Sequence, residues 1–194
     1  MNSEHMRKKI DVLLVIDMQN DFINGVLDNP AAAAIVPEVV REIREWKGTV
    51  IATRDTHFED SYKDSIEGKL LPIHCVYGTE GWKIQKDIQK ALEDQCTKFI
   101  NKHNFGYIAW PKAILDVDST DQDAVAALAS NYDITIRMVG TCTDICEASA
   151  YAMLRAWFPN ATIQVVANAS AASFNNQHQD AALDIARCML CDVV

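Results

Sequence analysis

Five short apolar runs, each rich in β-branched residues, recur along the chain and constrain its fold more than any other feature. They are DVLLVI at 11–16, TVIAT at 49–53, KFI at 98–100, ITIRMVG at 134–140 and TIQVVA at 162–167. Runs of this length and composition are typical of β-strands. They are continuous rather than alternating, as in parallel strands covered on both faces. The pattern predicts an α/β fold, a doubly wound, mostly parallel sheet with helices on both faces in a three-layer sandwich.

The segments between these runs carry the periodicity of helices. We expect helices at 31–46, 82–94, 119–131, 146–158 and 176–187. The last apolar segment, CMLCDVV at 188–194, makes the sheet five- or six-stranded, depending on whether it joins. Residues 55–81 fit no helical pattern and are long for a structureless connection, which indicates a functional role.

Length and composition bound the organisation of the chain. Its 194 residues are 49% hydrophobic and 23% charged, as in a globular protein with one core. We expect residues 1–9 to form a tail and 10–194 a single domain. No apolar run approaches the roughly 18 residues of a membrane span, and the start MNSEHMRKKI lacks the apolar stretch of a secretory signal. We therefore expect a cytoplasmic protein without a membrane partner.

Charge and cysteine content narrow the range of partners. The net charge is −9 and the largest basic cluster is the short RKK near the start, so we expect no nucleic-acid partner. The six cysteines are irregularly spaced, which favours reduced thiols over a disulfide framework. Cys188 and Cys191 form a CxxC, but no second CxxC accompanies them, and the pattern favours buried filler over a redox or zinc pair.

Residues just after the strands are the first candidates for function, because ligands of doubly wound sheets bind beyond the carboxyl ends of the strands. These residues are Asp17, the segment 54–57, Lys102 and the segment 141–146. The chain has no GxGxxG after its first strand and no Walker A motif. It therefore carries no signature of a dinucleotide or triphosphate site.

Cys146 lies at the start of a predicted helix and has two interpretations. It could be a core residue on an apolar helix face that continues through Ala150 and Leu154. Alternatively, the unpaired N–H groups and the dipole of the first helical turn would stabilise a thiolate, and the oxyanion formed when it attacks a carbonyl. Position favours Cys146 over Cys142 as the nucleophile, with Cys142 a small residue that shapes the turn.

Asp17, Lys102 and Cys146 are expected at one edge of the sheet. An ammonium beside a thiol lowers the pKa of the thiol, and a carboxylate there could accept its proton and hold the lysine. This triad fits acyl transfer through a thioester. The alternative is that all three are ordinary residues at strand ends.

Asp55 and His57 are two residues apart in an extended segment, so their side chains project to the same side and could reach one cation. His74 would be the third ligand. Three protein ligands leave positions open for a substrate, as in catalytic metal sites. The alternative is a common Asp-x-His loop sequence beside a surface histidine.

Four motifs in this order resemble the cysteine hydrolase superfamily of isochorismatase-like and nicotinamidase-like enzymes. They are VIDMQNDF at 15–22, HCVYGTEGW at 74–82, NKHNFGY at 101–107 and VGTCTDICEASA at 139–150. The resemblance extends over roughly Asp11–Leu183 and implies that Asp17, Lys102 and Cys146 are the catalytic triad. It also implies a cis peptide between Cys142 and Thr143, with the backbone N–H groups of Thr143 and Cys146 as the oxyanion hole.

Within that superfamily, Asp55, His57 and His74 resemble the metal ligands of nicotinamidases, whereas isochorismatases proper are metal-free. The resemblance implies a divalent cofactor, zinc first and iron or manganese as alternatives. The segment FEDSYKD lacks the further histidine that some nicotinamidases have, which leaves the coordination number open. Phe22 resembles the aromatic residue that stacks on the substrate; Tyr107 and Cys142 are further candidates for substrate contact. Homo-oligomers are expected from the same resemblance.

The resemblance therefore implies a metal-assisted amidohydrolase acting on a small molecule, with nicotinamide converted to nicotinate and ammonia. A second hypothesis is another isochorismatase-like hydrolase, acting on an N-carbamoyl amide or on the vinyl ether of isochorismate. A third is a non-catalytic binding protein that keeps the fold with an inert thiol.

Overall fold

A single sheet organises the computed structural model, which describes residues 7–95, 97–173 and 176–194. Its six strands are all parallel and lie in the order β3-β2-β1-β4-β5-β6. Their bounds are β1 Lys8–Ile16, β2 Thr49–Asp55, β3 Lys98–Lys102, β4 Tyr132–Thr141, β5 Thr162–Ala171 and β6 Asp192–Val193. The final apolar segment therefore contributes a short sixth strand, and β1 already begins inside the stretch that we assigned to the tail.

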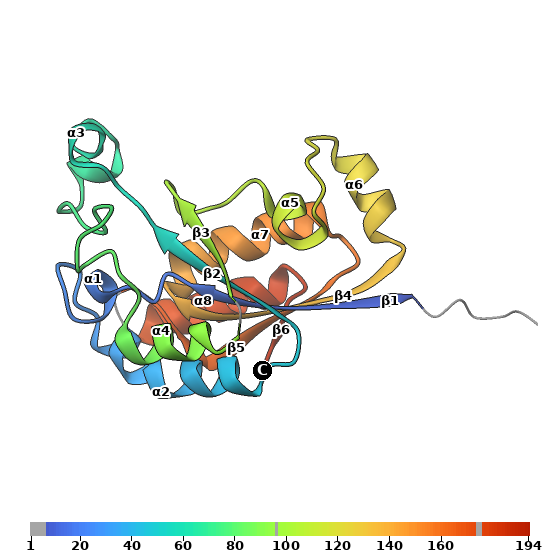
Figure 1. Cartoon of the computed structure of the whole chain (residues 1–194), viewed down its shortest axis with the longest axis horizontal. Coiled ribbons are helices and arrows are strands. Elements are labelled where there is room, and N and C mark those ends of the chain that lie inside the picture. Colours follow the sequence, from blue (N-terminus) through green and yellow to red (C-terminus); the bar gives the residue numbers. More distant parts are fainter. Residues whose placement is uncertain (1–6, 96, 174–175) are drawn as a thin grey trace, which may run out of the picture.

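Helices cover both faces of the sheet, which confirms the doubly wound, three-layer prediction (Figure 1). On one face lie α2 (Pro30–Glu45) and α4 (Lys86–Glu93); on the other lie α5 (Trp110–Leu115), α6 (Gln122–Ala129), α7 (Ala148–Trp157) and α8 (Asn176–Cys188). Short helical turns complete the set: α1 (Asn20–Ile23), α3 (Glu59–Tyr62), η1 (Glu67–Lys69) and the π-helical turn η2 (Thr143–Glu147).

Successive side chains of the central strand β1 point alternately into the two cores. Val12, Leu14 and Ile16 pack with α5 to α8, whereas Leu13 and Val15 pack under α2 and α4. All five side chains are buried. A strand with both faces covered needs apolar residues at every position, which is why the run is continuous.

The expected helices are present, with corrected bounds. The segment 82–94 becomes helical only at Lys86, because the Gln85 side chain accepts hydrogen bonds from the N–H groups of Asp87 and Ile88 and caps the helix there. Helix α5 was not predicted, since its six residues are too few to show a helical period. The segment 55–81 contains α3 and η1 and is otherwise irregular.

The strand order reverses between β1 and β4, and their carboxyl ends therefore mark the switch point of the sheet. Gly140 lets the two strands approach closely there. Its φ is +132°, and a Cβ at this position would lie 2.2 Å from the carbonyl oxygen of Ile16. The residues that follow, including η2, are thus held directly beside Asp17.

Within the part of the chain that the structure describes, none of the helices has the length and apolar character needed to cross a membrane.

Candidate active site

Lys102 joins Asp17 to Cys146 at the switch point. Its Nζ lies 2.6 Å from Oδ2 of Asp17 and 3.5 Å from Sγ of Cys146, and it also donates to the carbonyl of Asn104 at 3.1 Å. Lys102 is the last residue of β3, Asp17 follows β1, and Cys146 lies in η2 after β4. The three side chains are buried, with exposed fractions of 4%, 0% and 5% respectively. The structure therefore brings together all three members of the expected triad.

Burial sets the electrostatics of this group. The pKa of the Asp17 carboxyl is above its ordinary value, because complete burial raises it more than the Lys102 ammonium lowers it. Burial lowers the pKa of Lys102, but its acidic neighbours, Asp17 first among them, together outweigh burial and raise the pKa overall. The hydroxyl of Thr53 donates to Oδ1 of Asp17 at 2.6 Å and orients the carboxyl. Lys102 is thus a permanent cation beside a carboxyl suited to accept a proton.

The thiol of Cys146 differs from the expectation in one respect. Lys102 lowers its pKa, as predicted, but burial raises it more, and the net pKa lies well above the ordinary value. The resting group is therefore a neutral thiol. It needs a base to remove its proton, and Asp17, held by the same ammonium, is placed to serve as one.

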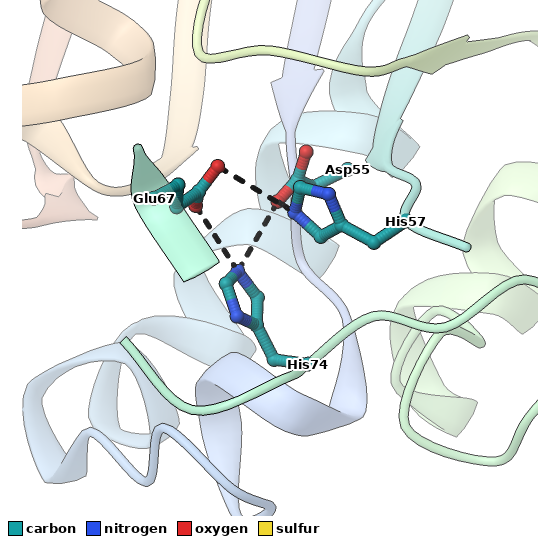
Figure 2. A group of neighbouring side chains, drawn as sticks. All are labelled: Asp55, His57, Glu67 and His74. Carbon is teal, nitrogen blue, oxygen red and sulfur yellow. Dashed lines mark hydrogen bonds and ion pairs between the residues drawn. The ribbon is translucent and has the colours of Figure 1, made fainter. Parts of the chain in front are cut away.

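Four side chains beside the triad form a group that could hold a metal ion. They are Asp55, His57, Glu67 and His74, whose nearest donor atoms all lie within 4.8 Å of one another. Figure 2 shows both imidazoles facing the two carboxylates. Nε2 of His57 is 2.9 Å and Nε2 of His74 is 3.4 Å from Oδ2 of Asp55, and the distances to Glu67 oxygens are 3.8 and 3.5 Å. The structure thus gathers the three expected ligands and adds a fourth.

Neighbouring groups fix the orientation of these ligands. The Gln19 side chain accepts from the N–H of Asp55 at 2.7 Å and donates to its carbonyl at 2.8 Å. Nδ1 of His74 lies 2.9 Å from the carbonyl of Pro72, an acceptor, so Nδ1 carries a hydrogen, and Nε2, which faces Oδ2 of Asp55, is the ring nitrogen that would bind a metal ion. The hydroxyl of Tyr62 lies 3.2 Å from the same Nδ1. Such supporting contacts are typical of metal sites.

Asp55 connects this group to the triad. Its Oδ2 faces the histidines, while its Oδ1 lies 3.7 Å from Nζ of Lys102. Burial raises the pKa of Asp55, but hydrogen bonds from His57 and His74 and the charge of the Lys102 ammonium together outweigh burial and hold the pKa below its ordinary range. The carboxyl is therefore ionised, as a metal ligand must be.

Sequence reasoning missed Glu67. It lies at the start of η1, and its side chain is 14% exposed. The segment 55–81 contains several other acidic residues, among them Glu59, Asp60 and Asp64. Because that segment has no regular period, the sequence offers no signal to decide which of these carboxylates lies beside His57 and His74.

A cavity of about 370 Å³ lies in front of Cys146. Phe22 and Cys142, two of the expected substrate contacts, line it, together with residues that the sequence analysis did not name, among them Leu71, Phe105 and Ile145. The ring of Phe22 packs edge-on against His74, with centroids 5.5 Å apart. The lining of the cavity is thus mostly apolar and includes the thiol and three of the four possible metal ligands, Asp55, Glu67 and His74.

Tyr107 lies elsewhere. It is not among the described residues that line this cavity, and its ring packs against Trp110 of α5 with centroids 5.2 Å apart. Chain direction explains the difference, because the turn after β3 sends Phe105 to the cavity and Tyr107 toward the core that α5 covers.

The expected cis peptide is present, but one residue earlier than predicted. It joins Thr141 to Cys142, and not Cys142 to Thr143. With no proline in the sequence TCT, nothing distinguishes one bond from the next at the sequence level. Thr143 and Cys146, whose N–H groups were expected to form the oxyanion hole, both lie in η2, immediately after this turn.

A parallel sheet that gathers a thiol, an ammonium and carboxylates at its switch point, in front of an apolar cavity, is typical of enzymes that act on small molecules. Comparison with known proteins places the chain within this class. It belongs to the isochorismatase domain family, whose pattern matches residues 11–194.

The individual proteins that this chain resembles are distant relatives by sequence identity. A nicotinamidase from Schizosaccharomyces pombe is 23% identical over 192 residues, covering 85% of this chain and 86% of that protein. The solved nicotinamidase/pyrazinamidase from Bacillus subtilis is 21% identical with a TM-score of 0.77, covering 95% of this chain and 99% of that one. A pyrazinamidase from Pyrococcus horikoshii, solved in complex with zinc, is 24% identical with a TM-score of 0.68 over 95% and 98% of the two chains.

Proposed function

We propose that the protein is a metal-assisted amidohydrolase that converts nicotinamide to nicotinate and ammonia. The observation that carries the proposal is Lys102, whose ammonium contacts the Cys146 thiol, the Asp17 carboxyl and the Asp55 carboxyl at once. A nucleophile, its base and a cluster of metal-binding side chains are thereby joined around one cation. The similarity to nicotinamidases from several organisms supports the choice of substrate.

The four-ligand group fits a divalent ion. Two imidazole nitrogens and two carboxylates suit zinc first, and also iron or manganese. We propose that Asp55, His57, Glu67 and His74 hold this ion. When bound, it would act as a Lewis acid that fixes the substrate ring and polarises water near the cavity.

The proposed reaction uses the triad in two half-reactions. Asp17 takes the proton of Cys146, and the sulfur attacks the carboxamide carbon, with Lys102 stabilising the thiolate as it forms. The N–H groups of Thr143 and Cys146 are proposed to receive the oxyanion. Asp17 then returns the proton to the leaving nitrogen, the C–N bond breaks, and ammonia departs. In the second half, Asp17 takes a proton from water as its oxygen attacks the thioester carbon, the C–S bond breaks, and Asp17 returns the proton to the sulfur. The free thiol is restored, and the acid released ionises to nicotinate.

The cavity suits a flat heteroaromatic ring. Phe22 supplies an aromatic face, and Cys142 lies at the rim beside the nucleophile. We propose these two as substrate contacts; Tyr107, which packs on Trp110, acts only through the core.

The first experiment measures ammonia release from nicotinamide by purified protein, with metal-replete and chelator-treated samples side by side. We expect turnover in the replete sample and a loss of at least about tenfold after chelation, restored by added zinc, iron or manganese. Full activity in chelator would favour a metal-free hydrolase acting on an N-carbamoyl amide or on isochorismate. No turnover of nicotinamide, the N-carbamoyl amide or isochorismate, together with an unreactive Cys146, would favour the non-catalytic binding protein.

Glu67 provides a second test of the metal group. We expect Glu67→Gln to weaken metal binding by about 10- to 100-fold, because one of four ligands loses its charge. The matched control is Glu59→Gln, which changes an exposed acidic residue of the same segment. Metal content after dialysis against a competing chelator is the measurement. Equal metal retention in the two variants would remove Glu67 from the ligand set.

We also propose a cytoplasmic location and association of identical copies. The five cysteines in the described part of the chain are free thiols, which a reducing compartment would preserve. Exposed apolar side chains such as Ile66, Leu70 and Ile108 would suit a contact between copies. Light scattering of the purified protein would decide the second point.

A further inference from the structure

Glu147 directly follows the proposed nucleophile and belongs to neither the triad nor the metal group. Its side chain is completely buried, with an exposed fraction of 0%. The hydroxyl of Ser170, near the end of β5, donates to Oε1 at 3.0 Å. Oε2 is also buried but has no hydrogen-bond partner. A buried carboxylate oxygen without a donor is costly, so its environment requires an explanation.

The charges that act on Glu147 are negative. Asp17, at the end of β1, and Asp144, within η2, both oppose its ionisation. His178 of α8 lies 3.1 Å from the Asp144 carboxylate. The other titratable groups facing Glu147 are Cys142 in the turn before η2 and Tyr151 in α7, both of which are neutral at pH 7 because burial raises their pKa to about 12. Nothing among these groups compensates a negative charge on Glu147.

Gln179 of α8 supplies the complementary observation. Its Nε2 donates to the carbonyl of Ser170 at 3.1 Å, while its Oε1 is buried without a partner. Glu147 and Gln179 thus meet at the same serine, and each leaves one buried oxygen without a donor. A single proton on Oε2 of Glu147 would turn one of these two acceptors into a donor.

We propose that Glu147 is held as a neutral carboxylic acid beneath the turn that carries Cys146, and that it positions this turn through Ser170 and Gln179. Complete burial raises the pKa of Glu147 to about 8, in agreement with this geometry. Glu147 is a positioning residue, since it acts on the nucleophile through η2.

Ionisation of Glu147 would have a direct consequence for the site. A second negative charge beside Cys146 disfavours both the thiolate and the oxyanion, because the buried site does not screen it. Catalysis would therefore fall reversibly at alkaline pH as Glu147 loses its proton. This consequence rests on the proposed hydrolase function, whereas the protonation state itself does not.

The first test measures protonation without turnover. Protein labelled with ¹³C at the glutamate carboxyls is titrated by NMR between pH 6 and 10, for the wild type and for Glu147→Gln. We expect the resonance that is missing in the variant to belong to a carboxyl that is protonated at pH 7 and titrates near pH 8. An ionised carboxyl at pH 7 would overturn the proposal. If the variant does not fold, the shift caused by Ser170→Ala identifies the resonance instead.

The second test uses the pH profile of kcat/KM for nicotinamide hydrolysis. Above pH 8 we expect the wild type to lose activity, approaching tenfold per pH unit, whereas Glu147→Gln keeps its activity. Ser170→Ala removes a bond that lowers the pKa of Glu147, so its alkaline limb should move to higher pH. Glu93→Gln, on the exposed side of α4, is the matched control and should keep the wild-type profile. An unchanged alkaline limb in Glu147→Gln would contradict the proposal. If nicotinamide is not the substrate, the NMR titration still decides the protonation state.

Discussion

Cys146→Ala will abolish ammonia release, with kcat falling by roughly 10⁴- to 10⁶-fold, as expected when a covalent nucleophile is removed. The sulfur is the atom that would bond to the carboxamide carbon, and among the residues that the structure describes no other thiol forms a hydrogen bond with Lys102. The loss should appear in kcat rather than in KM, because the cavity walls remain. Steady-state kinetics with nicotinamide measure both constants.

The control for this variant is Cys188→Ala. Of the two cysteines expected to be buried filler, Cys191 is buried but Cys188 is exposed, so its removal should leave turnover unchanged. Rapid quenching followed by mass spectrometry adds an independent readout. A nicotinoyl adduct should appear on the peptide that contains Cys146 in the wild type and be missing from Cys146→Ala. Amidase activity retained in Cys146→Ala would show that Cys146 is not the nucleophile.

The triad was predictable because strand ends are predictable. Continuous apolar runs located the strands, and parallel strands bring their carboxyl ends to one edge, so Asp17, Lys102 and Cys146 had to meet. The same argument located Asp55 at the end of β2. The sequence could not show whether burial or the charge of Lys102 dominates the pKa of the Cys146 thiol, because that depends on how deeply η2 is covered.

Residues outside regular elements were harder to predict. Glu67 comes from an irregular segment, where no period links sequence position to direction. Nothing in the sequence around Glu147 indicates that it is buried; the packing of α8 against η2 and the hydrogen bond from Ser170 of β5 reveal it. The shift of the cis peptide by one residue has the same origin, because no local signal marks the bond. Local patterns locate elements, while tertiary packing decides which loop residue enters a site.

Lys102→Met is the second variant with a large expected effect, on stability as well as on turnover. Removing the ammonium leaves Asp17 completely buried with its main partner gone, and breaking such a pair costs about 3–5 kcal/mol. We expect a lower melting temperature and a loss of activity of at least about 10³-fold, because both thiolate formation and proton transfer depend on this cation. Lys112→Met, which breaks an exposed pair with Asp116, is the control and should leave the melting temperature nearly unchanged, because exposed ion pairs contribute little to stability.

The pH dependence of this variant follows from the direction of the shifts. The raised pKa of Lys102 means that the contribution of the ammonium is fully present below the unfolded pKa of lysine, and it is lost only as pH rises through the higher folded pKa. The gap between wild type and Lys102→Met should therefore persist through neutral pH. It should narrow as the pH falls through the raised pKa of Asp17, because the carboxyl then takes up a proton and no longer needs a partner.

The double variant Asp17→Asn with Lys102→Met separates the two roles of the pair. Replacing both charges removes the buried unpaired group, so chemical denaturation should show stability recovered by most of the loss seen in Lys102→Met. Turnover should not recover, since neither the base nor the cation remains. Recovery of activity together with stability would mean that the pair serves only the fold, and that another group accepts the proton of Cys146.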